Sequence, residues 1–488
     1  MYRCLGYHIA EIPSILNVLS KKQNQKIINI KTCIEKESLV TKLQNKFAST
    51  EILLSEQFTK SKSKYNKSIF LDENTIKFLN ENLDDTLQIF SRYFIVNKFI
   101  NYSQIKQHIY SLACQSINLI KTNKIDLIIF YQTPHHIDSY ITFLISKQMN
   151  IKTIIIKQFS FFDEHRFCID EDLNTFFSDL NNYKSNNERS RIKSKDFLEK
   201  FINKDVKDAL YLRDNYIRNI KFLNKNNFFY YLYLDIKNFL FKHPKHHNGF
   251  YYWHKKDYFF ENSSINNIKF IVTNMILRAK ILILKLYYRW YSVNELPEKF
   301  ITFFPNYQPE ASTTPEASSY ADIYLILNNL SSMIPANCKI IYKEHKTTFD
   351  YSRESFTQKN ILFYRFLKKK FKNLIFYDFD CDKSKLIKNS QFIVTMTSNI
   401  AWEAMLNRKK VVITEGVWFD RFKGFVKIQE LEKKKDYLLS KNELEEFYVS
   451  HFIEYCNNIE ENSFSKLNSN VNKKEEKIES LLMKKIDK

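Results

Sequence analysis

The stretch 300–424 alternates short apolar runs with segments of helical spacing, and each apolar run breaks into polar residues at its end. This alternation predicts repeated βα units around a parallel sheet. Because ligands of such sheets bind beyond the carboxyl ends of the strands, the polar residues after the runs are candidates for one binding site. We expect strands at 299–304, 338–342, 374–378, 391–396 and 410–414, and helices near 319–333, 358–371, 382–389 and 399–407.

An earlier part of the chain shows the same alternation. Apolar residues recur at helical spacing from 105 to 120, the run 125–130 follows as a buried strand, and a helix at 138–149 leads to a strand at 151–156. This pattern indicates a second doubly wound domain, and 488 residues exceed what one core usually holds. We therefore expect α/β domains at 1–190 and 298–435, a helical insert at 191–297, and a helical, lysine-rich tail at 436–488 that frays from Asn472.

The chain is strongly basic, with a formal net charge of +21. Such a balance favours nucleic acids, phosphorylated ligands or an anionic membrane surface as partners, although lysines on a solvated surface give the same count. The stretch 228–260 interleaves aromatic residues with cations, which suits nucleic acid, a membrane interface or packing between domains. Nucleic acid is the least favoured partner, because no RNA- or DNA-binding module is recognised.

The expected location follows from three features. The start of the sequence has no long apolar run that resembles a signal peptide, and no stretch approaches the length needed to span a bilayer. The seven cysteines are scattered without a CxxC pair, which fits reduced thiols. We expect a cytoplasmic protein, either soluble or peripheral at the inner face of the membrane.

The segment around Ser398 has the features of an anion site. A strand ends at about 396, Thr397 and Ser398 offer hydroxyl groups, and a helix starts at about Asn399. Ser398 is a suitable N-cap, and the amides of the first helical turn favour a phosphate. Glu403 lies on the same helix, where its carboxylate can accept from two ribose hydroxyls. Asn407 is expected in the left-handed conformation that ends a helix, where Gly is usual.

Two further polar clusters follow strands of the same predicted sheet. Lys343 and His345 alternate at the end of theirs, so they face the same side and make a second contact to a phosphate or leaving group. The loop after the first strand is broken by Pro309 and Pro315 and is rich in groups that suit a sugar or nucleotide. Its polar residues are Gln308, Glu310, Ser312, Thr313 and Thr314.

In the first domain, Pro134 stops a strand, and His135 and His136 follow at its carboxyl end. Either histidine can act as a general base, with Asp138 as the carboxylate that orients it. A structural role for these histidines is the alternative. The polar run 157–165 leaves the next strand end and is expected to line the same cleft.

Several site classes find no support. The sequence contains no Walker A motif, no GxGxxG, no GxSxG and no zinc signature. His243, His246 and His247 resemble a metal cluster only superficially, and Asp378 and Asp380 are interpreted as a strand exit rather than a metal motif. We expect neither an essential metal nor a cofactor.

Three of these segments resemble motifs of the GT-B glycosyltransferase-like proteins of capsule and surface polysaccharide biosynthesis. The segment 304–314, FPNYQPEASTT, is similar to their FPLxYQPEATT loop, YKEH at 342–345 to their KEHP strand end, and TSNIAWEA at 397–404 to their TGTVGWEAL helix start. Residues 133–136, TPHH, match a weaker motif. The resemblance is good over 299–424 and weaker over 100–165. Lys346 stands where the family has Pro, and Ala401 where Gly is usual.

The resemblance implies two Rossmann-like domains that face a cleft, with a nucleotide-sugar donor held mainly by the second and the acceptor by the first. The implied activity is transfer of a sugar to a lipid-linked or growing surface glycan. A non-hydrolysing nucleotide-sugar 2-epimerase, and a basic nucleic-acid-binding protein, are the alternatives. The candidate catalytic residues are His345, Glu310, His135 and His136, and the candidate donor-binding residues are Gln308, Thr313, Thr314, Lys343, Thr397, Ser398, Asn399 and Glu403.

Overall fold

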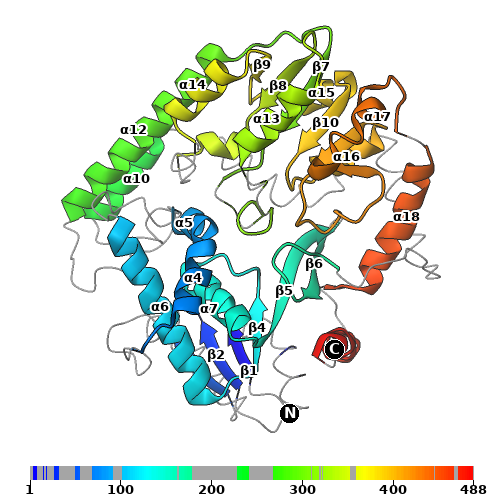
Figure 1. Ribbon diagram of the computed structural model, residues 1–488. Helices are drawn as coiled ribbons and strands as arrows, with labels where there is room; N and C mark the ends of the chain where they lie inside the picture. The colour runs from blue at the N-terminus through cyan, green and yellow to red at the C-terminus, as the bar shows by residue number, and fades with distance from the viewer. Residues whose placement is uncertain are drawn as a thin grey trace.

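The computed structural model describes residues 4–7, 15, 18, 27–31, 50–54, 69–91, 102–161, 164–177, 228–240, 267–308, 310, 312–317, 320, 322–351, 359–444, 446–465 and 471–486. These residues build two sheets flanked by helices, as the sequence predicted (Figure 1). We call the sheet near the amino terminus, with its helices, the first lobe, and the other sheet, with its helices, the second lobe.

The second lobe contains the sheet predicted from 300–424. Its strands run in the order β12-β11-β10-β7-β8-β9 and are all parallel. The central strands are buried along their length, so they require helices on both faces. The strands are β7 (Phe300–Phe304), β8 (Lys339–Lys343), β9 (Leu374–Tyr377), β10 (Phe392–Thr395), β11 (Lys410–Ile413) and β12 (Phe425–Lys427), and the helices are α13 (Ile323–Met333), α14 (Ile361–Lys370), α15 (Lys383–Asn389) and α16 (Ile400–Leu406).

The first lobe repeats this plan. Its strands run in the order β13-β6-β5-β4-β1-β2-β3, and β1 to β5 are parallel. Each lobe therefore has the 3-2-1-4-5 order of a Rossmann fold, with a switch point between its first and fourth strands. The elements are β1 (Cys4–Tyr7), β2 (Ile27–Lys31), β3 (Thr50–Leu54), α4 (Glu73–Glu81), α5 (Leu83–Ser91), α6 (Tyr102–Asn123), β4 (Leu127–Tyr131), α7 (Ile137–Gln148), β5 (Lys152–Phe161) and β6 (Glu164–Asp170).

The strand predicted at 151–156 was expected to end before the run 157–165, and that expectation is wrong. β5 continues to Phe161 and pairs antiparallel with β6, so the run forms the two strands of a hairpin. Burial explains this difference, because Phe159 and Phe161 are buried in a core, two residues apart on one face of the strand.

The carboxyl-terminal segment returns to the first lobe (Figure 1). After α17 (Lys435–Leu439) and α18 (Glu446–Glu461), the short strand β13 (Phe464–Ser465) pairs with β6. The predicted fraying from Asn472 is wrong, because α19 (Val471–Ile486) is a helix that buries Ile478, Leu482 and Ile486 in the same core as strands β4, β5 and β6. The tail is helical as expected, while the four domain boundaries stay predictions.

Two helices of the expected insert are described, α10 (Phe228–Leu240) and α12 (Asn267–Tyr291). α12 buries Leu284 and Tyr288 in the core on one face of the second sheet, and Arg278 lies over the ring of Tyr231 from α10, 4.6 Å from its centroid. His243, His246 and His247 fall outside the described residues, as does the rest of the aromatic-basic stretch. Within the ranges given above, no helix is long and apolar enough to cross a membrane.

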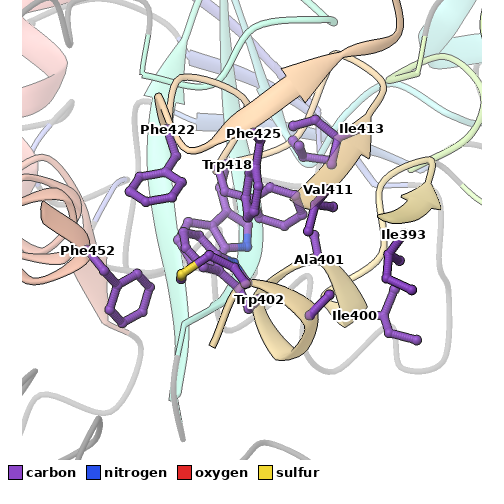
Figure 2. Packing of buried hydrophobic residues seen from close by; sticks show 14 of the residues in the cluster. Ile393, Ile400, Ala401, Trp402, Val411, Ile413, Trp418, Phe422, Phe425 and Phe452 are labelled. Carbon is purple, nitrogen blue, oxygen red and sulfur yellow. The ribbon is translucent and has the colours of Figure 1, made fainter. Parts of the chain in front are cut away.

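One hydrophobic core joins the two lobes. Trp418, in the loop after β11, stacks on Trp402 of α16 with ring centroids 5.1 Å apart, and it also contacts Phe159 and Phe161 of β5 at 5.5 and 5.4 Å. Tyr455 of α18 donates to the Trp418 carbonyl at 2.6 Å. Figure 2 shows the second-lobe part of this packing, with Trp402 and Trp418 at its centre. The lobes are therefore held together by buried apolar contact.

Candidate functional site

The switch point of the second sheet lies between the ends of β7 and β10. Asn306 follows β7 and Thr397 follows β10, and both residues are buried. The Asn306 amide donates to the Thr397 hydroxyl, and the Thr397 backbone N–H donates back to Asn306 Oδ1 at 3.2 Å. This double contact fixes two of the three predicted polar clusters against each other.

The third cluster, after β8, is held by Glu344. Its side chain is fully buried and forms an ion pair with Lys359, with Nζ 2.9 Å from Oε1. The hydroxyls of Tyr342 and Tyr364 donate to Oε2 at 2.9 and 2.6 Å. Thr348 Oγ1 and the His345 backbone N–H donate to Oε1 at 3.0 and 2.8 Å. Burial alone would raise the pKa of Glu344. The charge of Lys359 and these hydrogen-bond donors outweigh burial, so the pKa of Glu344 is lowered overall.

Lys359 connects this network to the switch point. Its Nζ also donates to the Asn306 backbone carbonyl at 3.0 Å. A continuous path therefore runs from Glu344 through Lys359 and Asn306 to Thr397. The three clusters were expected to meet, whereas Asn306 and Lys359 were not identified from the sequence. Asn306 lay within the quoted loop motif, and Lys359 lies in a stretch with no motif.

His345 begins a single helical turn, η4 (Lys346–Phe349), as its N-cap. Lys346 therefore takes the first helical position, where Pro is common and Lys is also tolerated. The Thr347 N–H donates to His345 Nδ1 at 3.3 Å, which places the proton of the neutral ring on Nε2. Desolvation by the surrounding protein lowers the pKa of His345 to about 4, although the residue keeps a solvent-accessible face. At neutral pH it offers one N–H donor and no charge.

Lys343 is buried at the end of β8, and its Nζ donates to the Phe379 carbonyl at 2.9 Å. Burial and the neighbouring charge of Lys346 lower the pKa of Lys343 to about 8. The charges of Lys343 and Lys383 both act on His345. These lysines therefore make the carboxyl end of β8 a cationic environment around an uncharged histidine.

α16 begins one residue later than predicted, so that Asn399 rather than Ser398 is its N-cap, and it also ends differently. Ser398 Oγ accepts from the Ile400 N–H at 3.4 Å, and Asn399, which is exposed, is the N-cap by position. The left-handed residue at the end is Arg408, at φ 55°, rather than Asn407. The Arg408 and Lys409 N–H groups donate to the carbonyls of Met405 and Ala404, and these bonds end the helix. Asn407, the residue before Arg408, is the C-cap.

Glu403 has a protein partner. Its Oε1 lies 2.5 Å from Lys383 Nζ of α15, and both side chains are partly exposed. The sequence assigned Glu403 to a ribose, and the structure shows that one of its oxygens already binds a lysine. Its other oxygen can still accept hydrogen bonds, and a lysine lies beside it. A role of Glu403 in donor binding therefore stays a proposal.

The loop after β7 turns back on itself. Thr313 is buried and donates to the Glu310 carbonyl at 2.8 Å, so its hydroxyl stabilises the turn. Glu310 itself is exposed, and its Oε2 accepts from Ser312 at 3.2 Å. Gln308 is half-buried.

The same loop reaches the first lobe at two points. Thr314 Oγ1 donates to Gln88 Oε1 of α5 at 2.7 Å, and Glu316 accepts a hydrogen bond from Thr133, directly after β4. Thr133 follows a strand of the first sheet and Glu316 a strand of the second. The carboxyl ends of the two sheets therefore face each other. Gln88 and Glu316 were not identified from the sequence, because nothing local marks an interlobe contact.

His135 and His136 lie at this junction. His135 Nδ1 is 2.7 Å from the Thr133 carbonyl, which can only accept, so the neutral ring has its lone pair on Nε2. The carbonyl thus takes the orienting role assigned to Asp138, which is buried within α7. His136 is the N-cap of α7, and the two rings lie 4.3 Å apart. A properly oriented lone pair is what a general base needs.

The structure thus brings Lys343, His345, Thr397 and Glu403 to one edge, and places His135 and His136 on the facing edge. Glu310, in the loop after β7, is close enough for its charge to act on Lys359. In the part of the chain that is described, no group of three His, Cys, Asp or Glu side chains is placed to hold a metal ion. Asp380 follows β9 and pairs with Arg289 at 2.5 Å.

Comparison with known proteins gives structural neighbours only. No protein-family model and no curated protein matches the sequence. Among solved structures, the UDP-GlcNAc 2-epimerase from Methanocaldococcus jannaschii is 11% identical with a TM-score of 0.23, covering 91% of this chain and 94% of that one. KpsC from Thermosulfurimonas dismutans, a beta Kdo 2,7 transferase, is 14% identical with a TM-score of 0.23, covering 42% of this chain and 62% of that one. A glycosyl transferase family 9 protein from Veillonella parvula is 8% identical with a TM-score of 0.19, covering 93% and 97%. What makes this chain GT-B-like is its own architecture: two sheets with the strand order of a Rossmann fold, whose carboxyl ends face each other.

Proposed function

We propose that this protein is a glycosyltransferase that moves a sugar from a nucleotide-sugar donor to a lipid-linked or growing surface glycan. The observation that supports this is the edge of the second sheet after β8, where the charges of Lys343 and Lys383 act on the neutral donor His345 beside the Glu344–Lys359 ion pair. This edge faces His135, whose neutral ring has its lone pair on Nε2. The lysines suit the negatively charged phosphates of a donor, and the histidine suits an acceptor hydroxyl that must lose its proton.

The donor lies on the second lobe in this proposal. Lys343 and Lys383 attract its phosphate oxygens, and the exposed Asn399 and half-buried Ser398 add contacts at the start of α16. His345 donates from Nε2 to the oxygen that becomes the leaving group. Because this oxygen gains negative charge during the reaction, the hydrogen bond strengthens in the transition state.

Glu403 contacts the ribose together with its partner Lys383, and Gln308 completes the donor site from the loop after β7. Thr313 and Thr314 contribute differently, because their hydroxyls already stabilise that loop and its contact with Gln88. They set the position of the loop and act on the donor indirectly.

The acceptor lies on the first lobe. His135 takes the proton of the acceptor hydroxyl as the new bond to the anomeric carbon forms. The bond between that carbon and the phosphate oxygen breaks, and the nucleotide leaves with both electrons. His136 and Glu310 border the same space and bind acceptor hydroxyls in this proposal. Metal-independent transfer is expected, and loss of activity in chelator with recovery in Mg²⁺ or Mn²⁺ would contradict it.

A thermal-shift screen against CMP-, UDP-, GDP- and TDP-sugars tests the donor site. A ligand that binds only the folded state stabilises it by about 2.7 kcal/mol at 100 times its dissociation constant. The screen should give one preferred nucleotide, and the shift should shrink in Lys343→Met. Release of the nucleotide with glycan acceptor present, and none without it, supports transfer. Conversion of the free nucleotide sugar without any acceptor would identify an epimerase instead, and no response to any donor would refute both.

A further inference from the structure

The side of α12 that faces away from the second lobe is exposed to solvent, yet it carries large apolar residues. Ile283, Leu286 and Trp290 have exposed fractions of 52%, 57% and 84%. With Ile276 these residues are spaced by seven, three and four along the helix, so they form one stripe. The opposite side buries Leu284 and Tyr288 in the second lobe. A helix that is apolar on both sides needs a second apolar environment.

α14 continues this surface. It packs against α12, with Lys368 Nζ 3.9 Å from the centre of the Tyr291 ring, and Figure 1 shows the two helices side by side at the outer edge of the second lobe. Leu362 and Phe366, one turn apart on α14, are 69% and 51% exposed. We call the exposed sides of these two helices the α12–α14 face.

The charge on these helices has one sign. α12 carries five lysines and arginines, α14 carries four, and neither contains an Asp or Glu. Arg278 is buried and Arg289 pairs with Asp380, but Lys280, Lys368 and Lys369 are exposed beside the apolar residues. Exposed aliphatic side chains, an exposed tryptophan and lysines without carboxylates on the same helices match a membrane surface with anionic headgroups.

We propose that the α12–α14 face docks on the surface of an anionic lipid bilayer. Ile283, Leu286 and Leu362 enter the boundary between headgroups and acyl chains, Trp290 lies at the level of the headgroups, and the lysines bind lipid phosphates. A second copy of the chain fits poorly, because pairing would bring the cations of both faces together. Nucleic acid also fits poorly, because Ile276, Ile283, Leu286 and Leu362 are exposed beside the rings of Trp290 and Phe366, and aliphatic side chains offer nothing on which bases can stack.

This docking is independent of the sugar chemistry, since vesicle binding is measured without any nucleotide sugar. The full-length protein is floated with vesicles of phosphatidylcholine alone and of phosphatidylcholine mixed with phosphatidylglycerol. Binding is expected with the mixed vesicles only, and it should weaken as salt is raised. Equal flotation with both vesicle types, or with neither, would overturn the proposal.

Two pairs of variants locate the contact. The double variant Leu286→Ser with Trp290→Ser should lower the partition coefficient between vesicles and water at least about tenfold. The control Phe70→Ser, at a site on the first lobe that is 91% exposed, should leave this coefficient unchanged. Lys368→Gln with Lys369→Gln should lower it about 30-fold, and Lys433→Gln with Lys434→Gln, both exposed elsewhere on the second lobe, should have little effect. Thermal unfolding shows that each variant folds.

Three results would refute the lipid assignment. The first is equal loss of binding in the matched controls, which would mean that net charge or general hydrophobicity controls flotation. The second is salt-sensitive binding of oligonucleotides that the Lys368 and Lys369 variant loses while vesicle binding persists. The third is a dimer in light scattering that Leu286→Ser with Trp290→Ser converts to a monomer, which would assign the face to a second copy.

Discussion

His345 illustrates how a side chain's surroundings decide its role. The sequence predicted a group that stabilises the leaving phosphate, and a protonated imidazole would do so by charge. With a pKa of about 4, the ring is neutral at physiological pH and acts through the Nε2 proton alone. We expect His345→Ala to lower the maximal rate by about tenfold or more, at least about 1.4 kcal/mol in activation free energy. Steady-state kinetics with a saturating donor measure this, and unchanged turnover would remove His345 from the reaction.

Glu403 should behave differently, because it contacts Lys383 and the proposed ribose position rather than the reacting bond. Glu403→Gln removes the charge and retains an acceptor oxygen. We expect the donor KM to rise several-fold while the maximal rate stays within about twofold. Glu443→Gln, an exposed carboxylate away from the site, is the control. A fall in the maximal rate without any change in KM would argue against a binding role.

Lys343 gives the site a pH dependence. A lysine is cationic below its pKa, and burial lowers that pKa to about 8 in the free protein. As the pH rises through 8 the cation is lost, so kcat/KM for the anionic donor should fall on the alkaline side. Lys343→Met should lower kcat/KM at neutral pH and abolish that alkaline limb, while Lys388→Met, exposed on α15, retains it. An unchanged alkaline limb in Lys343→Met would assign it to another group.

At the scale of elements, the second lobe was predictable because each strand between 300 and 413 is a mostly buried apolar run separated from the next by a clear helix. The five expected strands match β7 to β11, each within one residue at either end. β12 was missed because it is three residues long. In the first lobe β6 was missed, because it buries the charged residues Arg166 and Asp170 beside Phe167, Cys168 and Ile169, and its sequence therefore shows no apolar run.

The candidate site was predictable only in part. Thr397, Lys343 and His345 follow strands, and strand ends are visible in a sequence. Glu344, Lys359 and Asn306 are held together by tertiary contacts, so their roles depend on how β7, β8 and β10 are ordered in the sheet. The chain has only 4 glycines, and Arg408 therefore takes a left-handed position that glycine usually fills, which misplaced the expected helix end by one residue.

The Glu344 network predicts how these elements depend on one another. Both charged side chains of the Lys359–Glu344 pair have no exposed surface. Lys359→Met leaves the carboxylate buried without its cation, and we expect the free energy of unfolding to fall by about 3–5 kcal/mol. Urea denaturation measures this. Lys427→Met, which removes one partner of an exposed pair with Glu415 at 3.5 Å, should cost less than about 1 kcal/mol. Equal effects of the two substitutions would show that burial does not control the cost.

At the scale of the whole molecule, three contacts among the described residues connect the lobes, one by aromatic packing and two by hydrogen bonds. Trp418 packs against β5, Glu316 accepts from Thr133, and Thr314 donates to Gln88. All three come from loops at the carboxyl ends of strands, where the donor and acceptor sites are proposed. The relative position of the two sites therefore depends on how tightly these loops hold the lobes together.

Asp420 makes this junction sensitive to pH. Its Oδ2 accepts from the Gly416 N–H at 3.2 Å, while its Oδ1 is buried without a hydrogen-bond partner among the described residues. Desolvation raises the pKa of Asp420 from 3.8 to about 6. Between these values the folded protein keeps a proton that the unfolded chain releases, so this group's contribution to stability falls as the pH rises from about 4 to 6. At neutral pH the buried carboxylate costs up to about 3 kcal/mol.

Asp420→Asn removes the charge at every pH and should relieve this cost. The free energy of unfolding of the variant relative to the natural protein should therefore increase between about pH 4 and pH 7, by about 1–3 kcal/mol. Urea denaturation of both proteins at each pH measures the difference, which cancels the contributions of all other carboxylates. Asp436→Asn, exposed on α17, should show no such increase. A difference for Asp420→Asn that stays constant with pH would mean that the carboxyl group at the lobe junction has an ordinary pKa, and that the junction does not respond to pH through this residue.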